Sequence, residues 1–332
     1  MNGNKHKINL GIVGVRGYVG RELVRLLADD EQINLAWISS RQLEGHSLSS
    51  LLDNDVRFKN TTIPDDHYFH QLCIECLSEV EVANRTTEII VLALPNGLAK
   101  SFVSELEQSG KKRIIIDLSA DYRFDPNWDY SVPELFTKAG LKLKFDNSNL
   151  LKISNPGCYA TAMQVALAPL IGRIVDVANC FGISGYSGAG TKPSTNNNPE
   201  NLKDNILPYG LIEHLHEKEV AYQLGIPIHF SPHVAQFFRG ISMTVQIDLS
   251  EVQTLKQISD LFTEFYAGDT KIVAQNPVPN IQQVVNTENC IVGGFSLSAD
   301  GKRLTLVSCL DNLLKGAASQ ALDNIKIALH QW

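Results

Sequence analysis

Residues 8–20 read INLGIVGVRGYVG, and this stretch sets the architecture of the amino-terminal half. The apolar run at 8–13 predicts a strand, the spaced glycines predict a turn, and the apolar periodicity of 21–28 predicts a helix. A second strand is expected at 35–38. Strand, glycine turn, helix and strand in this order make a βαβ unit, which predicts a parallel sheet.

The glycine turn also predicts a binding site for a dinucleotide. Glycines allow the main chain to approach a pyrophosphate closely, and the amino end of the next helix faces the phosphate charge. The spacing is G-x-x-G-x-x-G, and its place directly after a first strand supports the prediction. The expected contacts to the cofactor are the turn residues Gly14, Arg16, Gly17, Tyr18, Val19 and Gly20.

The end of the second strand indicates which dinucleotide is bound. An acidic residue there would hold the ribose hydroxyls of NAD, but the chain has Ser39, Ser40 and Arg41. Two hydroxyls and a guanidinium suit a 2′-phosphate, so NADP(H) is favoured over NAD. The alternative is an exposed loop that contains an arginine by chance.

Two fully apolar runs, 89–94 and 114–116, predict further strands of a parallel sheet that is buried on both faces. The loop that begins at Pro95 and the loop 117–123 follow these strands. They are expected at the carboxyl edge of the sheet, where doubly wound folds bind ligands. Residues 42–87 are polar and irregular, and no element is predicted there.

The segment SNPGCYAT at 154–161 marks a change in the chain. Pro156 and Gly157 force a turn, and an apolar helical pattern follows, so Cys158 is expected at the start of a helix. Free amides and the helix dipole favour a thiolate there, and the same amides could hold an oxyanion. The placement predicts a catalytic thiol; the alternative is a small buried cysteine.

The second half of the chain has a different pattern, with alternating strands and separate helices. This mixture predicts an antiparallel sheet with helices on one face. The expected fold class is therefore α/β, a Rossmann-type parallel-sheet domain plus an α+β catalytic domain with a mostly antiparallel sheet. The strands are expected at 241–247, 291–297 and 304–310, and the helices at 251–266 and 316–329.

Composition excludes several classes of protein. The 332 residues suggest two domains, and a net charge of −7 disfavours nucleic acid as the main partner. Residues 1–7 do not read as a signal peptide, and no apolar run of about 18 residues predicts a membrane span. The six scattered cysteines are therefore expected to be reduced thiols in the cytoplasm. Cys73 and Cys76 lack a second pair for zinc and are interpreted as structural.

A thiolate that attacks an acyl group needs a proton partner, and histidine is the usual one. The densest candidate segment contains His214, His216 and Glu219. Histidines two apart on a helix point in different directions, which argues against a metal site, and exposed helix histidines remain an alternative. A small-residue loop ending at Lys192 could wrap a phosphate, and Arg239 could clamp an anion; ordinary surface loops are the alternative for both.

Taken together, these motifs resemble the N-acetyl-gamma-glutamyl-phosphate reductase family, and the resemblance covers almost the whole chain. The signature around Cys158 and its order relative to the histidine segment are the most specific features. The matching segments are 14–20, 117–123, 155–161, 187–190, 208–210, 214–219, Pro232-His233, Arg239-Gly240 and 311–318.

The resemblance implies that Cys158 attacks an acyl phosphate and that NADPH reduces the resulting thioester to a semialdehyde. It implies His214 as the catalytic histidine with Glu219 orienting it, and His216 as the alternative. It also implies a cofactor domain of residues 1–155 plus about 312–332, and a catalytic and oligomerisation domain of residues 156–311 in a homodimer or homotetramer. The implied substrate contacts are Arg123, Asn155, Lys192, His216 and Arg239, and further cofactor contacts are Pro95, Ser187, Gly188 and Asn312.

The chain departs from the family pattern at several places near the site. Leu215 and Lys218 replace an Arg and a Pro, residues 130–134 read YSVPE, and Gln236 stands where a Pro is common. These changes bear on the group that blocks the substrate nitrogen. Alternative activities are aspartate-semialdehyde dehydrogenase and the reduction of an aminoadipyl phosphate. A non-catalytic NADP-binding sensor is an alternative of another class.

Overall fold

The structure is a computed structural model, and it describes residues 7–53, 63–64 and 67–332. The expectation that residues 1–7 are not a signal peptide falls mostly on residues outside this set. The chain forms two compact units: the described residues up to Pro156 together with Ala318–Trp332, and Gly157–Ala317. Within the described ranges, no helix is both long and apolar enough to cross a membrane.

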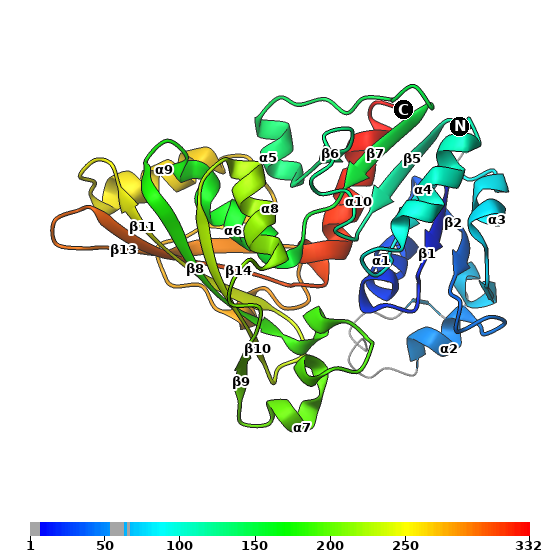
Figure 1. Ribbon diagram of the computed structural model, residues 1–332, viewed down its shortest axis with the longest axis horizontal. Helices are drawn as coiled ribbons and strands as arrows, with labels where there is room; N and C mark the ends of the chain where they lie inside the picture. Colours follow the sequence, from blue (N-terminus) through cyan, green and yellow to red (C-terminus); the bar gives the residue numbers. More distant parts are fainter. Residues whose placement is uncertain (1–6, 54–62, 65–66) are drawn as a thin grey trace. The chain divides into compact units, whose positions relative to one another are not determined.

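The first unit is built on a parallel seven-stranded sheet with the order β3-β2-β1-β4-β5-β7-β6 (Figure 1). Its order reverses beside β1, which is typical of a doubly wound fold. The strands are β1 (Ile8–Val13), β2 (Ile33–Ser39), β3 (Ile74–Glu75), β4 (Ile89–Leu92), β5 (Arg113–Asp117), β6 (Asp129–Tyr130) and β7 (Leu150–Ser154).

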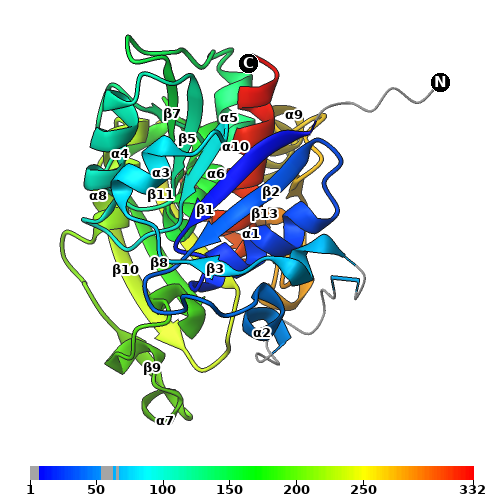
Figure 2. The ribbon, with the colours of Figure 1, turned by 90° about the vertical axis from the view of Figure 1, so that its right-hand side faces the viewer.

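Helices cover both faces of this sheet. Successive residues of a strand point to opposite faces, so they belong to two separate hydrophobic cores. Ile89 and Val91 of β4 pack with α1 and α10, whereas Ile90 and Leu92 pack with α3 and α4. Helices α1 and α10 contact each other although they come from opposite ends of the chain (Figure 2). The helices are α1 (Tyr18–Ala28), α2 (Leu48–Asp53), α3 (Glu79–Asn84), α4 (Ala99–Gln108), α5 (Pro133–Lys138) and α10 (Ser319–Leu329), with the 3-10 turn η2 (Tyr68–Gln71).

The second unit is built on a mixed, mostly antiparallel sheet with the order β12-β13-β14-β11-β8-β10-β9. Two of its pairs, β8 with β10 and β12 with β13, are parallel. The strands are β8 (Ile174–Gly185), β9 (Ile206–Pro208), β10 (Ile228–Ala235), β11 (Ile241–Leu249), β12 (Ile272–Ala274), β13 (Cys290–Leu297) and β14 (Arg303–Leu310).

Helix α6 lies at the centre of this unit. It contacts β11, β14 and α8, and residues 159–167 are all buried. The Tyr266 hydroxyl at the end of α9 donates to the Val165 carbonyl (2.7 Å), which ties a second helix to α6. The helices are α6 (Cys158–Leu167), α7 (Pro199–Leu202), α8 (Leu215–Leu224) and α9 (Leu255–Phe265). Short turns are η3 (Ala168–Leu170), η4 (Tyr186–Ala189), η5 (Thr195–Asn197), η6 (Ile281–Gln283) and the π-turn η7 (Leu314–Ala318).

Several sequence expectations need correction. Helix α1 begins at Tyr18, three residues before the expected start, because Gly17 has the extended conformation of an N-cap. The region 42–87 contains α2, β3 and α3, and α3 begins with a capping box between Ser78 and Glu81. The final helix starts at Ser319 instead of residue 316, because η7 precedes it. Strand β8, the longest in its sheet, was not expected.

Candidate active site

The glycine turn lies between β1 and α1 and has the shape that a phosphate needs. Gly14 has φ +94°, and a Cβ there would lie 2.2 Å from the Ala93 carbonyl oxygen. The Gly14 and Val15 amides donate to the Ser39 carbonyl (2.8 and 3.1 Å), which fixes the turn against β2. Gly17 caps α1 without a side-chain bond, and Arg16 and Tyr18 beside it are half-buried. This cradle fits a dinucleotide phosphate.

The three residues expected to select NADP have different surroundings. Ser39 is buried, and its hydroxyl accepts a hydrogen bond from the Leu77 amide (3.2 Å). Ser40 is also buried. The Arg41 side chain is 66% exposed and pairs with Glu79 (3.1 Å). An exposed ion pair of this kind contributes little free energy, so Arg41 can exchange Glu79 for a phosphate.

The loops after β4 and β5 are hydrogen-bonded to each other. Asp121 accepts from the amides of Gly97 (2.6 Å) and Ala99 (3.1 Å), where α4 begins. Asp117 is fully buried and accepts from the amide and hydroxyl of Ser119. Burial raises the pKa of the Asp117 carboxyl to about 6, against the lowering effect of the Ser119 hydrogen bonds.

Arg123 and Asn155, two expected substrate contacts, lie together in the first unit. Arg123 is buried and donates from Nε to the Asn155 carbonyl (3.1 Å) and from Nη2 to the Leu118 carbonyl (3.2 Å). The Asn155 side chain accepts from Nδ2 of Asn324 on α10 (3.0 Å). Pro95 is exposed in the loop that follows β4. Arg123 therefore links the loop after β5 to Asn155, the residue just before the Pro-Gly turn.

Cys158 is the first residue of α6 and is half-buried. Gly157 before it is extended, with φ −72° and ψ 155°, and has no side-chain cap. Gly316 of η7 packs directly on the cysteine, since a Cβ at position 316 would lie 2.7 Å from the Cys158 Cβ. Cys158 therefore lies at a helix amino terminus, where the sequence places it, with Gly316 packed against its Cβ.

Glu219 supports the start of α6 from within the second unit. The residue lies on α8, is fully buried, and accepts a hydrogen bond from the Gly157 amide at Oε1 (2.9 Å). This amide belongs to the residue that precedes Cys158. Glu219 thus fixes the turn that carries the thiol, while its expected role in orienting His214 stays a prediction.

His214 is the N-cap of α8. Its Nδ1 accepts a hydrogen bond from the His216 amide (3.1 Å), so a neutral ring carries its proton on Nε2. Burial lowers the pKa of His214, and the nearby Glu217 carboxylate opposes this shift. The ring is therefore held as a neutral hydrogen-bond donor at neutral pH. His216 lies in the first turn of the same helix, with its ring centroid 5.1 Å from that of His214.

These histidines belong to an aromatic cluster next to Cys158, formed by Tyr159, Tyr209, His214, His216 and Phe230. The Tyr159 ring contacts three other members, and its hydroxyl donates to the His233 carbonyl (2.6 Å). Burial raises the pKa of Tyr209 to about 12, and the charge of Cys158 adds to the shift. The phenol of Tyr209 therefore stays protonated at neutral pH.

A second group of predicted site residues, Ser187, Arg239 and Asn312, lies at and next to η4. Asn312 donates from Nδ2 to the Ser187 hydroxyl (2.9 Å) and accepts from the Gly240 amide (2.7 Å). Arg239 forms a buried ion pair with Asp311 through Nε (2.7 Å) and Nη2 (3.1 Å). This bidentate pair gives Arg239 a structural partner, and its role as a substrate contact stays a prediction.

Lys192 and Gly188 are exposed. The Lys192 carbonyl accepts a hydrogen bond from the Asn197 side chain (2.7 Å), which ties the end of the small-residue loop to η5. Among the described residues, no group of three or more His, Cys, Asp or Glu side chains could hold a metal ion.

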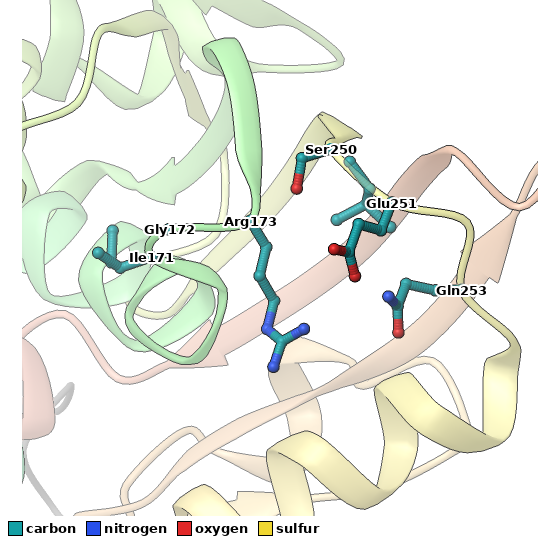
Figure 3. Close-up of a pocket in the computed structure, with 7 residues that line it drawn as sticks. Ile171, Gly172, Arg173, Ser250, Glu251 and Gln253 are labelled. Atoms are coloured by element: carbon teal, nitrogen blue, oxygen red, sulfur yellow. The ribbon is translucent and has the colours of Figure 1, made fainter.

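A pocket of about 250 Å³ in the second unit lies at the other end of α6, after η3. Arg173, Glu251 and Gln253 gather around it (Figure 3). None of the predicted site residues lines this pocket, so it is separate from the thiol site.

Three contributors to the thiol site escaped the site prediction. Tyr209 carried only a weak signal, the Pro-Tyr-Gly segment. Tyr159 is adjacent to the nucleophile in sequence, yet its hydroxyl partner His233 is far along the chain. Gly316 approaches Cys158 only because η7 folds back onto α6.

Comparison with known proteins agrees with this architecture. The family model described as "Semialdehyde dehydrogenase, NAD binding domain" matches residues 9–142, and "Semialdehyde dehydrogenase, dimerisation domain" matches residues 158–312. The fold resembles aspartate semialdehyde dehydrogenase II from Vibrio cholerae, with a TM-score of 0.74 and 17% identity over 98% of this chain and 99% of that one. It also resembles the Candida albicans enzyme with NADP (TM-score 0.72, 14% identity, 97% and 98% covered). The predicted fold class and nicotinamide cofactor are confirmed.

Closer relatives in sequence share one name. The N-acetyl-gamma-glutamyl-phosphate reductase of Xanthomonas euvesicatoria pv. vesicatoria is 44% identical over 96% of this chain and 95% of its own length. The protein of that name from Stenotrophomonas maltophilia is 44% identical over 98% and 96%. The resemblance found in the motifs is thereby confirmed. The chain belongs to the N-acetyl-gamma-glutamyl-phosphate reductase family of the semialdehyde dehydrogenases.

Proposed function

We propose that this protein reduces N-acetyl-L-glutamyl 5-phosphate to N-acetyl-L-glutamate 5-semialdehyde and phosphate, with NADPH, in arginine biosynthesis. The carrying observation is the placement of Cys158 at the bare amino terminus of α6, with Glu219 fixing the preceding amide. The name shared by relatives that are 44% identical supports the substrate.

The chemistry proceeds through a thioester on Cys158. The thiolate attacks the acyl carbon, the carbon–oxygen bond to phosphate breaks, and phosphate leaves. NADPH, when bound at the glycine turn, supplies the hydride that reduces the thioester carbon. The resulting thiohemiacetal oxyanion is held by the amides at the start of α6 and then collapses, which breaks the carbon–sulfur bond and releases the aldehyde.

His214 serves this sequence as a proton donor. Its Nδ1 is occupied by the His216 amide, so Nε2–H is the group available to an oxyanion. The amino end of α8 and burial both keep the ring neutral, which preserves this donor at neutral pH. His216 is the alternative residue for this role.

The other assignments concern the cofactor, the substrate and the assembly. NADP(H) is favoured over NAD because Arg41 stands at the end of β2. Arg123, Asn155 and Lys192 contact the substrate. The unit that contains Cys158 also forms the contacts of a homodimer or homotetramer, in agreement with the name of its family model. The enzyme acts in the cytoplasm.

The test is the reverse reaction with N-acetyl-glutamate semialdehyde, NADP and inorganic phosphate, followed by the absorbance of NADPH. Phosphate-dependent NADPH formation is expected. Activity only with aspartate semialdehyde or another blocked semialdehyde would move the substrate and keep the chemistry. Tight NADPH binding without turnover of any of them would favour a non-catalytic sensor.

A further inference from the structure

We infer that the buried ion pair between Arg239 and Asp311 positions the nucleophile, so that Arg239 is a positioning residue for Cys158 and not an anion contact. The inference deepens the proposed function and rests on it for turnover, but not for the reactivity of the thiol itself. The pair acts through η7, the π-turn that packs on Cys158.

Every nitrogen of the Arg239 guanidinium already has a partner within the second unit. Nε and Nη2 face the two carboxylate oxygens of Asp311 (2.7 and 3.1 Å), and Nη1 donates to Oδ1 of Asn286 (2.9 Å). The Arg239 side chain is only 7% exposed, and that of Asp311 is fully buried. A substrate anion could take over Arg239 only by leaving the Asp311 carboxylate buried without its cation, which is strongly unfavourable.

Asp311 joins this ion pair to the start of η7. Its Oδ1 accepts hydrogen bonds from the amides of Leu313 (2.9 Å) and Leu314 (3.3 Å), as a capping carboxylate does at the beginning of a helix. Its carbonyl accepts from the Gly316 amide (2.9 Å), a bond over five residues that is typical of a π-turn. The position of Asp311 therefore determines where Gly316 lies.

Two further segments hold the ion pair in place. The Asn286 amide donates to Oδ2 of Asp311 (2.8 Å), so Asn286 contacts both members of the pair. The amide of Gly240, next to Arg239, donates to Oδ1 of Asn312 (2.7 Å), the residue that follows Asp311. The segments before β11, before β13 and after β14 are therefore joined at one buried pair.

The contact between Gly316 and Cys158 passes this position on to the thiol. A Cβ at Gly316 would lie 2.7 Å from Cβ and 3.2 Å from Cα of Cys158, so the two residues pack directly on each other. Residues 159–167, which follow the cysteine in α6, are all buried. Cys158 therefore lies between η7 and a fixed helix, at the helix end where free amides favour the thiolate.

The test is Arg239→Lys in the full-length protein, because lysine keeps the charge but cannot bridge both Asp311 oxygens and Asn286. The first measurement is the rate of Cys158 alkylation by iodoacetamide at pH 7, without substrate or cofactor. Peptide mass spectrometry separates it from the exposed Cys73 and Cys76. The rate is expected to fall about fivefold, since the thiol leaves its place at the helix end. Arg303→Lys, at an exposed position on β14, is the matched control and should leave the rate unchanged.

The second measurement is turnover in the phosphate-dependent assay, which separates positioning from substrate binding. For Arg239→Lys we expect kcat to fall about tenfold, with the KM values for phosphate and semialdehyde within about twofold of the wild type. A contact to the substrate would instead raise a KM and leave the alkylation rate unchanged. That result would overturn the inference. Absence of the reverse reaction in the wild type would remove the proposed function and leave the alkylation test intact.

The route through η7 is tested by combining Arg239→Lys with Gly316→Ala. Because both changes act on one contact, the double variant should alkylate little more slowly than Gly316→Ala alone. Rate losses that multiply would overturn the inference.

A milder variant decides the test if Arg239→Lys does not fold. Asn286→Gly removes the acceptor of Nη1 and keeps the left-handed backbone that Asn286 has (φ +61°). The alkylation rate should then fall about twofold. A rate equal to that of the wild type would overturn the inference in this case.

Discussion

Two helices, one in each unit, follow a glycine in nearly the same extended conformation. Gly17 before α1 has φ −63° and ψ 157°, and Gly157 before α6 has φ −72° and ψ 155°. Neither helix has a side-chain cap. The residues beyond differ: α1 is amphipathic and packs one face on the sheet, whereas α6 is buried on every side from Tyr159 onward.

The surroundings of the two helix starts explain what each can do. The Gly17 amide, which precedes α1, bonds to the Gly14 carbonyl within its own turn (3.2 Å), and this turn is the expected cradle for an exchangeable anion. The Gly157 amide bonds to the buried Glu219 from another helix. A start anchored by long-range contacts suits a group that must form and break a bond at one position. The same local device thus serves reversible binding in one unit and covalent chemistry in the other.

The largest effect that would separate the two helix starts is expected for Cys158→Ala. Turnover should fall on the order of 10³-fold or more, because the thioester cannot form. NADPH affinity, measured by fluorescence titration, should stay within about twofold of the wild type. Cys73→Ala, which removes an exposed thiol of the first unit, serves as the control. Residual turnover above about a tenth of the wild type would contradict the role of Cys158.

A subtler way to disturb only the thiol is Gly316→Ala. The new methyl group would lie 2.7 Å from the Cys158 Cβ, so the thiol must move. A displacement of this size is expected to lower kcat about 100-fold with little change in NADPH affinity. Gly268→Ala is the matched control, since a Cβ there meets no atom although φ is +84°. Gly316 has no positive φ, so equal kcat losses in both variants would mean that a general effect of the substitution, not the contact with Cys158, is responsible.

Arg41→Ala tests whether the unit that contains α1 binds the 2′-phosphate of NADPH. The loss of a charge-assisted contact should weaken NADPH binding by about tenfold or more and leave NADH binding nearly unchanged. Glu79→Gln removes the present partner of Arg41 and should leave NADPH binding equal or tighter. Isothermal titration with both cofactors measures these effects. Equal losses for NADPH and NADH would show that Arg41 does not contact the 2′-phosphate.

The smallest expected effect is a pH dependence of stability from Asp117. Its pKa of about 6 in the folded protein is above the ordinary 3.8, so the folded state binds the proton more tightly than the unfolded chain. Its contribution is present below about pH 4 and is lost as the pH rises through 6, a change of about 3 kcal/mol.

Urea unfolding of Asp117→Asn at pH 4 and pH 7 measures this contribution. The stability difference between variant and wild type should shift in favour of the variant by about 3 kcal/mol at the higher pH. Asp248→Asn, at an exposed position on β11, should show no such shift. A constant difference for Asp117→Asn across this range would mean that the carboxyl ionises normally when folded.

The first half of the chain is predictable where one local pattern decides the structure. Strand β4 and the centre of β5 are continuous apolar runs, and the glycine turn is marked by its spacing and its place after β1. The 42–87 region is harder, because α3 has only six residues and its capping box stands among polar neighbours. Short elements of this kind depend on the core that they cover more than on their own sequence.

The second sheet contains a strand, β8, that its sequence pattern does not predict. β8 spans Ile174–Gly185, but Asp176 at φ +60° and a register shift against β11 interrupt its alternation. At the thiol site, Cys158 and His214 are recognisable because their residue types carry the chemistry. Gly316 is not recognisable, because it approaches Cys158 only through the fold and is distant from it in the chain.

The place of α10 has a consequence for the order in which the protein matures during synthesis. Ala321, Leu322 and Ile325 complete the core between the first sheet and α1, although they are made after all of residues 157–317. Residues 157–317 form one compact unit and leave the ribosome before α10 does. They can therefore fold while the first unit still lacks this helix. Until residues 318–332 have been made, α1 lacks the apolar partners that α10 supplies. A premature stop near residue 317 would therefore yield a folded middle and an aggregation-prone beginning.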